Sequence, residues 1–258
     1  DSSGVVASVA LVEDDVLLGE FGTNFHKTHS TTLLPMLDEL MEMLSINVSE
    51  SGIDGIAVAK GPGSFTGLRI GAATAKGLAL AWDVPIFPVS TLAGLACNLW
   101  GVDGLICTLM DARRGQVYTA LYQFAEKCCR EQGGAIEGAA NPETGGELAV
   151  SLEEVLAPCA VSIEEIIEKI NVIKERVTFL GDGVPVFSEK IKALCKNKFR
   201  FAPASANRQR AACLGAYVCK LGERAERIDG RRFAPEYLRL SQAERERLER
   251  QQREAGAR

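Results

Sequence analysis

The chain has 258 residues and a net charge of −5, with 47% hydrophobic and 24% charged residues. These proportions are ordinary for a globular protein and leave room for one large domain or two small ones. No apolar run reaches the roughly 18 residues that a membrane-spanning helix needs. The negative charge also argues against a protein that holds a nucleic-acid backbone by itself.

The chain contains eight cysteines, none of them in a C-x-x-C pair. This spacing argues against a zinc ribbon or a thioredoxin-like redox site. Most of these cysteines lie in apolar runs such as 106–109. We therefore expect buried, reduced cysteines and a cytoplasmic location.

The first 45 residues predict a β-hairpin followed by a helix. Residues 5–12 and 16–21 are rich in strand-forming residues, and acidic residues 13–15 form the turn. Residues 30–45 predict a helix with Pro35 in its first turn, where a missing N–H costs little. The helix is apolar well beyond one stripe, so we expect it to have two packing partners. Its apolar residues are Leu33, Leu34, Met36, Leu37, Leu40, Met41, Met43 and Leu44.

A buried strand at 55–59 leads into a glycine-rich loop and a helix at 67–82, followed by a strand at 85–89 and a helix at 91–100. In the 67–82 helix, Gly67, Gly71 and Ala75 recur every four residues. This spacing predicts a flat face for close helix approach. Because each interior glycine costs about 1 kcal/mol relative to alanine, a compensating contact is expected.

The pattern then restarts, which indicates a weak internal duplication with a boundary near 101–104. Residues 105–110 and 116–122 predict strands around a turn at 111–115, and residues 124–149 predict a flexible insertion. Capping boxes at Ser151–Glu154 and Ser162–Glu165 each predict the start of a helix. A strand at 177–181 and helices at 184–195 and 205–222 follow. We therefore expect an α/β protein with mixed sheets, divided into 1–102, 103–238 and a charged tail at 239–258.

The glycine-rich loop consists of residues 61–67, with Gly61, Gly63, Ser64, Thr66 and Gly67 as its candidate site residues. A Walker A loop would end in Gly-Lys-Ser/Thr, whereas Leu68 and Arg69 follow here. A dinucleotide-binding loop would have glycine at position 66 and an acid on the next strand, and both are missing. A tight strand-to-helix turn is the simplest interpretation.

Four segments resemble the TsaB (YeaZ) family and occur in that family's order. The most specific is the run from Lys60 to Gly71, continuing through 75–79; the others are residues 29–36, 111–118 and 235–239. The insertion at 124–149 and the tail have no counterpart in this resemblance. In that family the first strand ends in Asp-Thr/Ser-Ser, so residues 1–3 would be that end and about one strand would be absent from this sequence.

The resemblance implies an actin/hexokinase-like fold of two related halves and a non-catalytic role. The implied partner is a larger paralogue, TsaD, which carries the metal and transfers a threonylcarbamoyl group to the adenosine next to the anticodon of tRNA. A small P-loop ATPase, TsaE, would join the pair, and tRNA would be reached through the complex. The family pairs through its first two helices, which implies an interface here at Leu33, Leu34, Met36, Leu37, Leu40, Met41, Gly67, Arg69, Gly71 and Ala75.

Two other functions remain open from the residues. Asp1 and Asp111 could be the paired acids of a sugar-kinase-like enzyme or ATPase, each at a strand end, although Gly181–Gly183 is short for an adenosine loop. Alternatively, both acids are turn residues. The apolar helix pair could also form a homodimer. His26 and His29 are the only histidines and have no nearby third ligand, so we expect neither a metal nor another cofactor.

Overall fold

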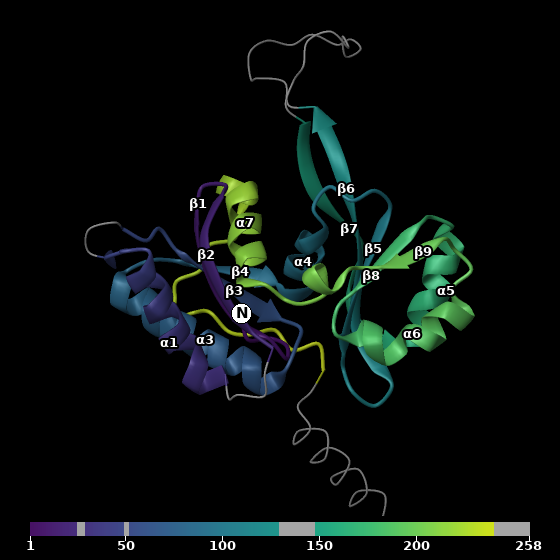
Figure 1. The fold of residues 1–258 in the computed structure, drawn as a ribbon, viewed down its shortest axis with the longest axis horizontal. Coiled ribbons are helices and arrows are strands. Elements are labelled where there is room, and N and C mark those ends of the chain that lie inside the picture. Colours follow the sequence, from purple (N-terminus) through teal and green to yellow (C-terminus); the bar gives the residue numbers. More distant parts are fainter. Residues whose placement is uncertain (25–28, 49–51, 129–147, 240–258) are drawn as a thin grey trace, which may run out of the picture.

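The strands form two groups that lie side by side, one built from residues before 91 and one from residues after 104 (Figure 1). The computed structural model describes residues 1–24, 29–48, 52–128 and 148–239. None of the helices in these ranges is long and apolar enough to span a membrane.

The first group contains two separate two-stranded ladders. Strands β1 (Ala7–Glu13) and β2 (Val16–Thr23) are antiparallel, which confirms the predicted hairpin. Strands β3 (Ile56–Gly61) and β4 (Ile86–Ser90) are parallel and are joined through helix α3 (Phe65–Trp82). Helix α1 (His29–Met43) lies beside α3 (Figure 1).

The second group is one mixed sheet with the strand order β7-β6-β5-β8-β9. Its strands are β5 (Leu105–Asp111), β6 (Gln116–Cys128), β7 (Leu148–Ser162), β8 (Val177–Leu180) and β9 (Phe199–Phe201). The central strand β5 is antiparallel to β6 and parallel to β8. Helices α5 (Ile163–Ile173) and α6 (Gly183–Leu194) pack on this sheet through a cluster of fully buried side chains. This arrangement confirms the predicted mixed sheet flanked by helices.

Two helices pack across the boundary between the groups. Helix α4 (Thr91–Ala96), continued by the short helix η1 (Cys97–Leu99), follows β4, but Leu92 and Leu95 pack with Ile106 and Met110 of β5. Helix α7 (Ala211–Leu221) follows the second sheet, but Leu214 packs with Ala59 and Val89 of the first group. The boundary at 101–104 therefore divides the sequence but not the packing of these helices.

Two local predictions are wrong or incomplete. Ser151 and Glu154 do not begin a helix, because β7 pairs with β6 along its length and places Ser151 opposite Ala125. The predicted insertion at 124–149 begins and ends as strand, at 124–128 and from 148. The rest of the insertion and the tail after residue 239 lie outside the described residues.

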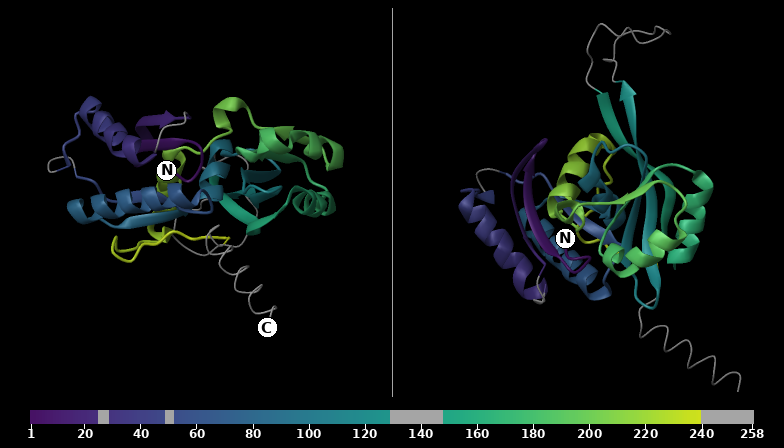
Figure 2. Two further views of the ribbon diagram at one scale, coloured as in Figure 1. Left: turned by 90° about the horizontal axis from the view of Figure 1, so that it is seen from below. Right: turned by 45° about the vertical axis from the view of Figure 1, so that its right-hand side comes forward.

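The remaining predicted helix starts in the second half of the chain agree with the structure to different degrees. The capping box at Ser162 and Glu165 is present and begins α5. The predicted helix at 205–222 is shorter, because the short helix η2 (Ala204–Ala206) and an extended segment precede α7. After α7, a short helix η3 (Gly222–Arg224) leads into the C-terminal segment of residues 225–239. Figure 2 shows this segment, in yellow, running back along the first group of strands.

Candidate partner interface and interdomain cleft

Helix α1 divides the predicted interface residues between its inner and outer sides. Leu33 and Leu40 are 5% and 3% exposed, so they hold the helix against the rest of the protein. Leu40 packs against the hairpin so closely that a Cβ at Gly19 would overlap its side chain. Leu34 is 49% exposed on the outer side, whereas Met43, which is 67% exposed, lies about 180° around the helix from it. Met36, Leu37 and Met41 are half-buried between the two sides.

The stripe of Gly67, Gly71 and Ala75 on α3, which the sequence predicted as part of the interface, packs against the chain's own residues. A Cβ at Gly67 would overlap the carbonyl oxygen of Ser2, and one at Gly71 would lie 2.8 Å from the Ser2 hydroxyl. Ala75 is 4% exposed and packs in a buried cluster with Val58. The compensating contact for these glycines is therefore made within the chain, with the backbone and side chain of Ser2.

The outer side of α3 carries a second stripe of small residues. Ala73, Gly77 and Ala81 are exposed and follow each other every four residues. A Cβ at Gly77 would have no atom within 4 Å in this structure, so its missing side chain leaves open space. Leu80 beside it is 56% exposed, and Arg69 is exposed one turn before Ala73. Sequence periodicity missed this stripe because it recurs at the same interval as the inner one.

The glycine-rich loop is covered by the chain's own backbone. The N–H of Ser64 donates to the carbonyl of Ser3 at 2.7 Å. A Cβ at Gly63 would overlap that same carbonyl, and one at Gly61, whose φ is +127°, would overlap the carbonyl of Glu236. Thr66 is exposed in the first turn of α3. These glycines therefore allow the backbone of other segments of the chain to pack closely against the loop, as in a tight structural turn.

The C-terminal segment of residues 225–239 joins the loop to the second half of the chain. The Glu236 N–H donates to the Lys60 carbonyl at 2.7 Å, and the Lys60 ammonium lies 2.9 Å from the Glu236 carboxylate. The Tyr237 ring stacks on Phe65 at 4.8 Å between centroids. At the far end, Arg239 donates to the carbonyl of Ala112 at 2.7 Å. This segment thus bridges the two groups of strands beside the glycine-rich loop.

Asp1 and Asp111 occupy equivalent turns in the two halves. The carboxylate of Asp1 accepts from the Ser3 N–H at 2.7 Å, and that of Asp111 accepts from the Arg113 N–H at 2.8 Å. Each is the local turn in which an aspartate bonds to the backbone two residues on. Asp111 also forms an ion pair with the Arg113 side chain at 3.3 Å. Both acids therefore act as turn residues here, and the kinase alternative gains no support from their geometry.

Asp182 is a half-buried acid beside Asp111 that sequence analysis did not single out. It accepts a hydrogen bond from the Asp111 N–H at 3.2 Å. Burial raises the pKa of its carboxyl, and the Asp111 N–H and the nearby Arg208 oppose that shift. The short 181–183 turn, in which Gly181 donates to the Asn207 side chain at 2.6 Å, is thus held by protein groups.

The described residues contain no group of three metal-ligating side chains. His29 makes a hydrogen bond with the Gly4 carbonyl at 3.2 Å through Nε2. That contact ties the start of α1 to the residues that precede β1. His26 lies outside the described residues.

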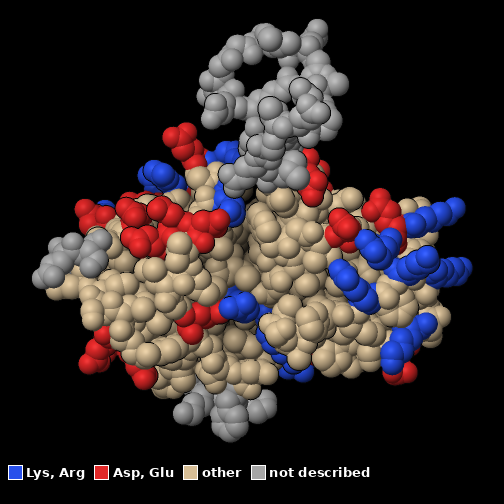
Figure 3. Space-filling view, turned by 45° about the horizontal axis from the view of Figure 1, so that its top comes forward, with Lys and Arg blue, Asp and Glu red and all other residues tan. Residues whose placement is uncertain are grey.

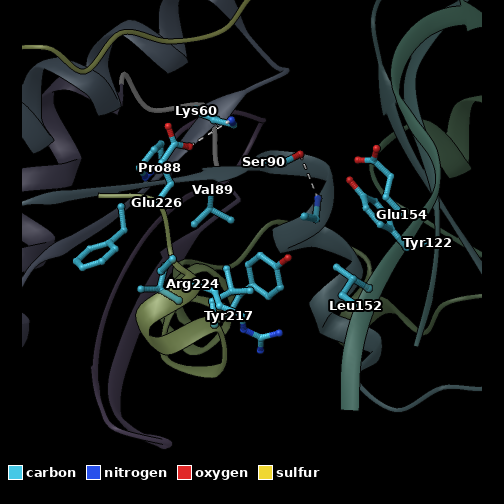
Figure 4. Close-up of a pocket in the computed structure, with 15 residues that line it drawn as sticks. Lys60, Pro88, Val89, Ser90, Tyr122, Leu152, Glu154, Tyr217, Arg224 and Glu226 are labelled. Carbon is cyan, nitrogen blue, oxygen red and sulfur yellow. Dashed lines mark hydrogen bonds and ion pairs between the residues drawn. The ribbon is translucent and has the colours of Figure 1, made fainter. Parts of the chain in front are cut away.

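A cavity of about 280 Å³ opens between the two groups of strands, and Lys60 is one of the residues that line it. Figure 4 shows Tyr122 and Glu154, from β6 and β7, across from Ser90 of β4 and Tyr217 of α7. Burial raises the pKa of both tyrosine hydroxyls, which keeps them protonated at neutral pH. Its lining combines the hydroxyls of Ser90, Tyr122 and Tyr217 with charged side chains that include Lys60 and Glu154.

Known proteins resemble the chain in sequence and in fold. The profile of the family described as "TsaD: tRNA N6-adenosine threonylcarbamoyltransferase" matches residues 22–247. The tRNA threonylcarbamoyladenosine biosynthesis protein TsaB of Bacillus subtilis is 32% identical over 95% of this chain and 94% of its own length. The Escherichia coli TsaB is 36% identical over 49% of this chain and 54% of its own length.

Solved structures agree with the sequence comparisons. YeaZ from Pseudomonas aeruginosa matches with a TM-score of 0.62 and 25% identity, covering 92% of this chain and 96% of that one. A second Pseudomonas aeruginosa structure, of an uncharacterized protein with similarity to peptidase YEAZ, gives a TM-score of 0.67 at 23% identity and the same coverage. The fold is thus the actin/hexokinase-like α/β fold with a mixed sheet, and the chain belongs to the TsaB (YeaZ) family.

Proposed function

We propose that this chain takes part in tRNA threonylcarbamoyladenosine biosynthesis as a subunit without chemistry of its own. In this proposal it pairs with a larger TsaD-like protein that modifies the adenosine next to the anticodon. A TsaE-like P-loop ATPase joins the pair, and the catalytic protein holds most of the tRNA. Full-length similarity to TsaB supports the pathway. The self-filled glycine-rich loop and the two turn aspartates support the non-catalytic role.

The observation that carries the proposal is an exposed apolar surface on two neighbouring helices. We call it the pairing surface and define it by Leu34, Ala73, Gly77 and Leu80. The two leucine side chains are 49% and 56% exposed, respectively. Exposed leucines near a stripe of glycine and alanine allow another helix to approach closely. The pairing surface replaces the inner stripe that the sequence suggested.

Co-expression with the TsaD-like protein of the same organism, followed by size exclusion with light scattering, tests the proposal. We expect a one-to-one complex from the unaltered chain and none from Gly77→Arg, because the arginine would fill the open space on α3. Ala193→Arg on α6 is the matched control, since it adds the same charge to an exposed helical position in the other half. Equal complex formation by both variants would contradict this surface.

The same experiment separates the homodimer alternative. A chain that self-associates alone and dissociates when the TsaD-like protein is added uses one surface for both contacts. A chain that stays a homodimer in the presence of the TsaD-like protein, with no mixed complex, would overturn the proposed function.

A further inference from the structure

Cations gather at one end of the second half, although the chain as a whole is acidic. Between residues 169 and 200 the sequence has eight Lys and Arg residues but three Asp and Glu residues. Figure 3 shows Lys and Arg side chains projecting together from the right-hand end of the molecule. We call the exposed cations on the loops and edge strand at this end the basic corner. They are Lys174, Arg176, Lys196, Lys198 and Arg200.

Hydrogen bonds fix the backbone of the basic corner. The Asn197 side chain donates to the carbonyls of Ile170 and Glu175 at 2.8 and 2.9 Å. The Asn171 side chain accepts from the Lys196 N–H at 2.8 Å and donates to Leu194 at 3.0 Å. The end of α5, the end of α6 and the loop before β9 are therefore tied into one unit.

Few of the nearby acids neutralise these cations. In the part of the chain that the structure describes, Lys174, Lys196 and Lys198 have no carboxylate within ion-pair distance, whereas Lys190 and Lys192 pair with Glu164 and Glu189. Arg176 lies 3.7 Å from Asp103, and Arg200 donates to the Thr178 hydroxyl at 3.0 Å. Charges farther away than the Debye length of about 8 Å are screened, so a ligand here meets the local positive field rather than the net charge of −5.

We infer that the basic corner binds the sugar-phosphate backbone of the tRNA that the complex modifies. This inference rests on the proposed function, which brings RNA to the complex. Phosphate is the polyanion that clustered Lys and Arg side chains bind without reading sequence. The neighbouring aromatic rings, Phe199 and Phe201, contact Phe179 edge-on and tilted, at 6.0 and 6.2 Å between ring centroids. Both are partly buried, so the corner offers charge rather than base stacking.

The position of the basic corner fits a second contact point on a long ligand. Helices α1 and α3, which carry the pairing surface, lie at the opposite end of the molecule from α5, α6 and β9 (Figure 1). A TsaD-like protein on the pairing surface would leave the corner uncovered. The chain would then extend the RNA-binding surface of the complex.

A triple variant tests the inference: Lys174→Asn, Lys196→Gln and Lys198→Gln. Asparagine suits position 174 because the residue there has a φ of +63°. The control variant removes three other exposed cations, by Arg227→Gln, Arg231→Gln and Arg232→Gln. Binding of an unmodified tRNA transcript is titrated across a series of salt concentrations, with the assembled complex and with the free chain.

We expect the triple variant to lower tRNA affinity about tenfold and to reduce the slope of log affinity against log salt by about 2 to 3, with the control unchanged. Equal affinity and slope in the two variants would overturn the inference. The inference would also be overturned if the triple variant lost binding to phosphatidylserine vesicles but kept its tRNA affinity, because the basic corner would then bind anionic membranes. Light scattering on the same samples distinguishes the failure of this inference from the failure of the proposed function. If the unaltered chain does not pair with the TsaD-like protein, the proposed function is overturned. The salt dependence of tRNA binding by the free chain then still tests the RNA contact.

Discussion

Glu20 on β2 and Arg210, at the start of α7, form an ion pair between residues 190 positions apart, with Nε of the arginine 2.8 Å from the carboxylate. The second oxygen of Glu20 accepts from the Ala212 N–H at 3.0 Å. One carboxylate thus caps α7 and ties it to the hairpin. The hydrogen bonds of Glu20 raise the pKa of the Arg210 guanidinium. The Glu20 side chain is 14% exposed, so water screens this pair less than a surface pair.

Glu20→Gln is therefore expected to lower the free energy of unfolding by about 2 kcal/mol, because a charged acceptor that bonds to both Arg210 and Ala212 is replaced by a neutral one. Urea unfolding followed by circular dichroism measures the change. Lys220→Gln is the control, since it removes an exposed ion pair with Asp15 and should cost less than about 1 kcal/mol. Equal losses of unfolding free energy from the two variants would show that the Glu20–Arg210 pair stabilises the fold no more than an exposed ion pair does.

Alanine at the two kinds of glycine on α3 should have opposite effects. Gly77→Ala adds a Cβ in open space and should stabilise the free chain by about 0.5–1 kcal/mol through helix propensity. Gly67→Ala places its Cβ against the Ser2 carbonyl and should destabilise it by about 1–3 kcal/mol. Thermal unfolding of the two variants measures both signs. A stabilised Gly67→Ala protein would mean that the inner stripe is not packed as described.

The C-terminal segment should contribute to stability through one buried anchor. Phe233 is 2% exposed and packs with Val58 and Ile86. Phe233→Ala should lower the free energy of unfolding by about 3–5 kcal/mol, the usual cost of removing a buried phenyl ring. Tyr237→Phe removes one hydroxyl bonded to Arg69 at an exposed position and should change it little. If Phe233→Ala were as mild as Tyr237→Phe, the segment would not be anchored to β4 and α3.

Asp182 should give the protein a pH dependence with a defined sign. Burial raises the pKa of its carboxyl above the ordinary value of an aspartate, so the folded state holds this proton at a higher pH than the unfolded state does. The group therefore removes stability as the pH rises from the unfolded pKa through the folded one. Asp182→Asn keeps the acceptor for the Asp111 N–H and lacks that titration. Urea unfolding between mildly acidic and neutral pH should show that the free energy of unfolding of the variant rises relative to that of the unaltered protein as the pH rises. A difference that stays constant with pH would contradict a raised pKa for Asp182.

The sequence predicted the local elements of the fold because their causes are local. The hairpin at 7–23 follows from strand-forming residues on both sides of an acidic turn, and the Ser162–Glu165 capping box begins α5 as its pattern predicts. The same capping pattern failed at Ser151–Glu154, where pairing with β6 outweighs a local preference. Resemblance to the TsaB family supplied the fold, because its glycine-rich run is specific.

Tertiary structure alone decided which of two equivalent stripes on α3 faces outward. Gly67 and Gly77 both lie at intervals of four in small-residue rows, and periodicity cannot tell whether Ser2 or open space lies opposite. The basic corner has the same origin: Lys174 and Lys198 are far apart in an acidic chain until Asn171 and Asn197 bind their loops together. Net charge and residue spacing are properties of the linear sequence, whereas a surface forms from residues that only folding brings together.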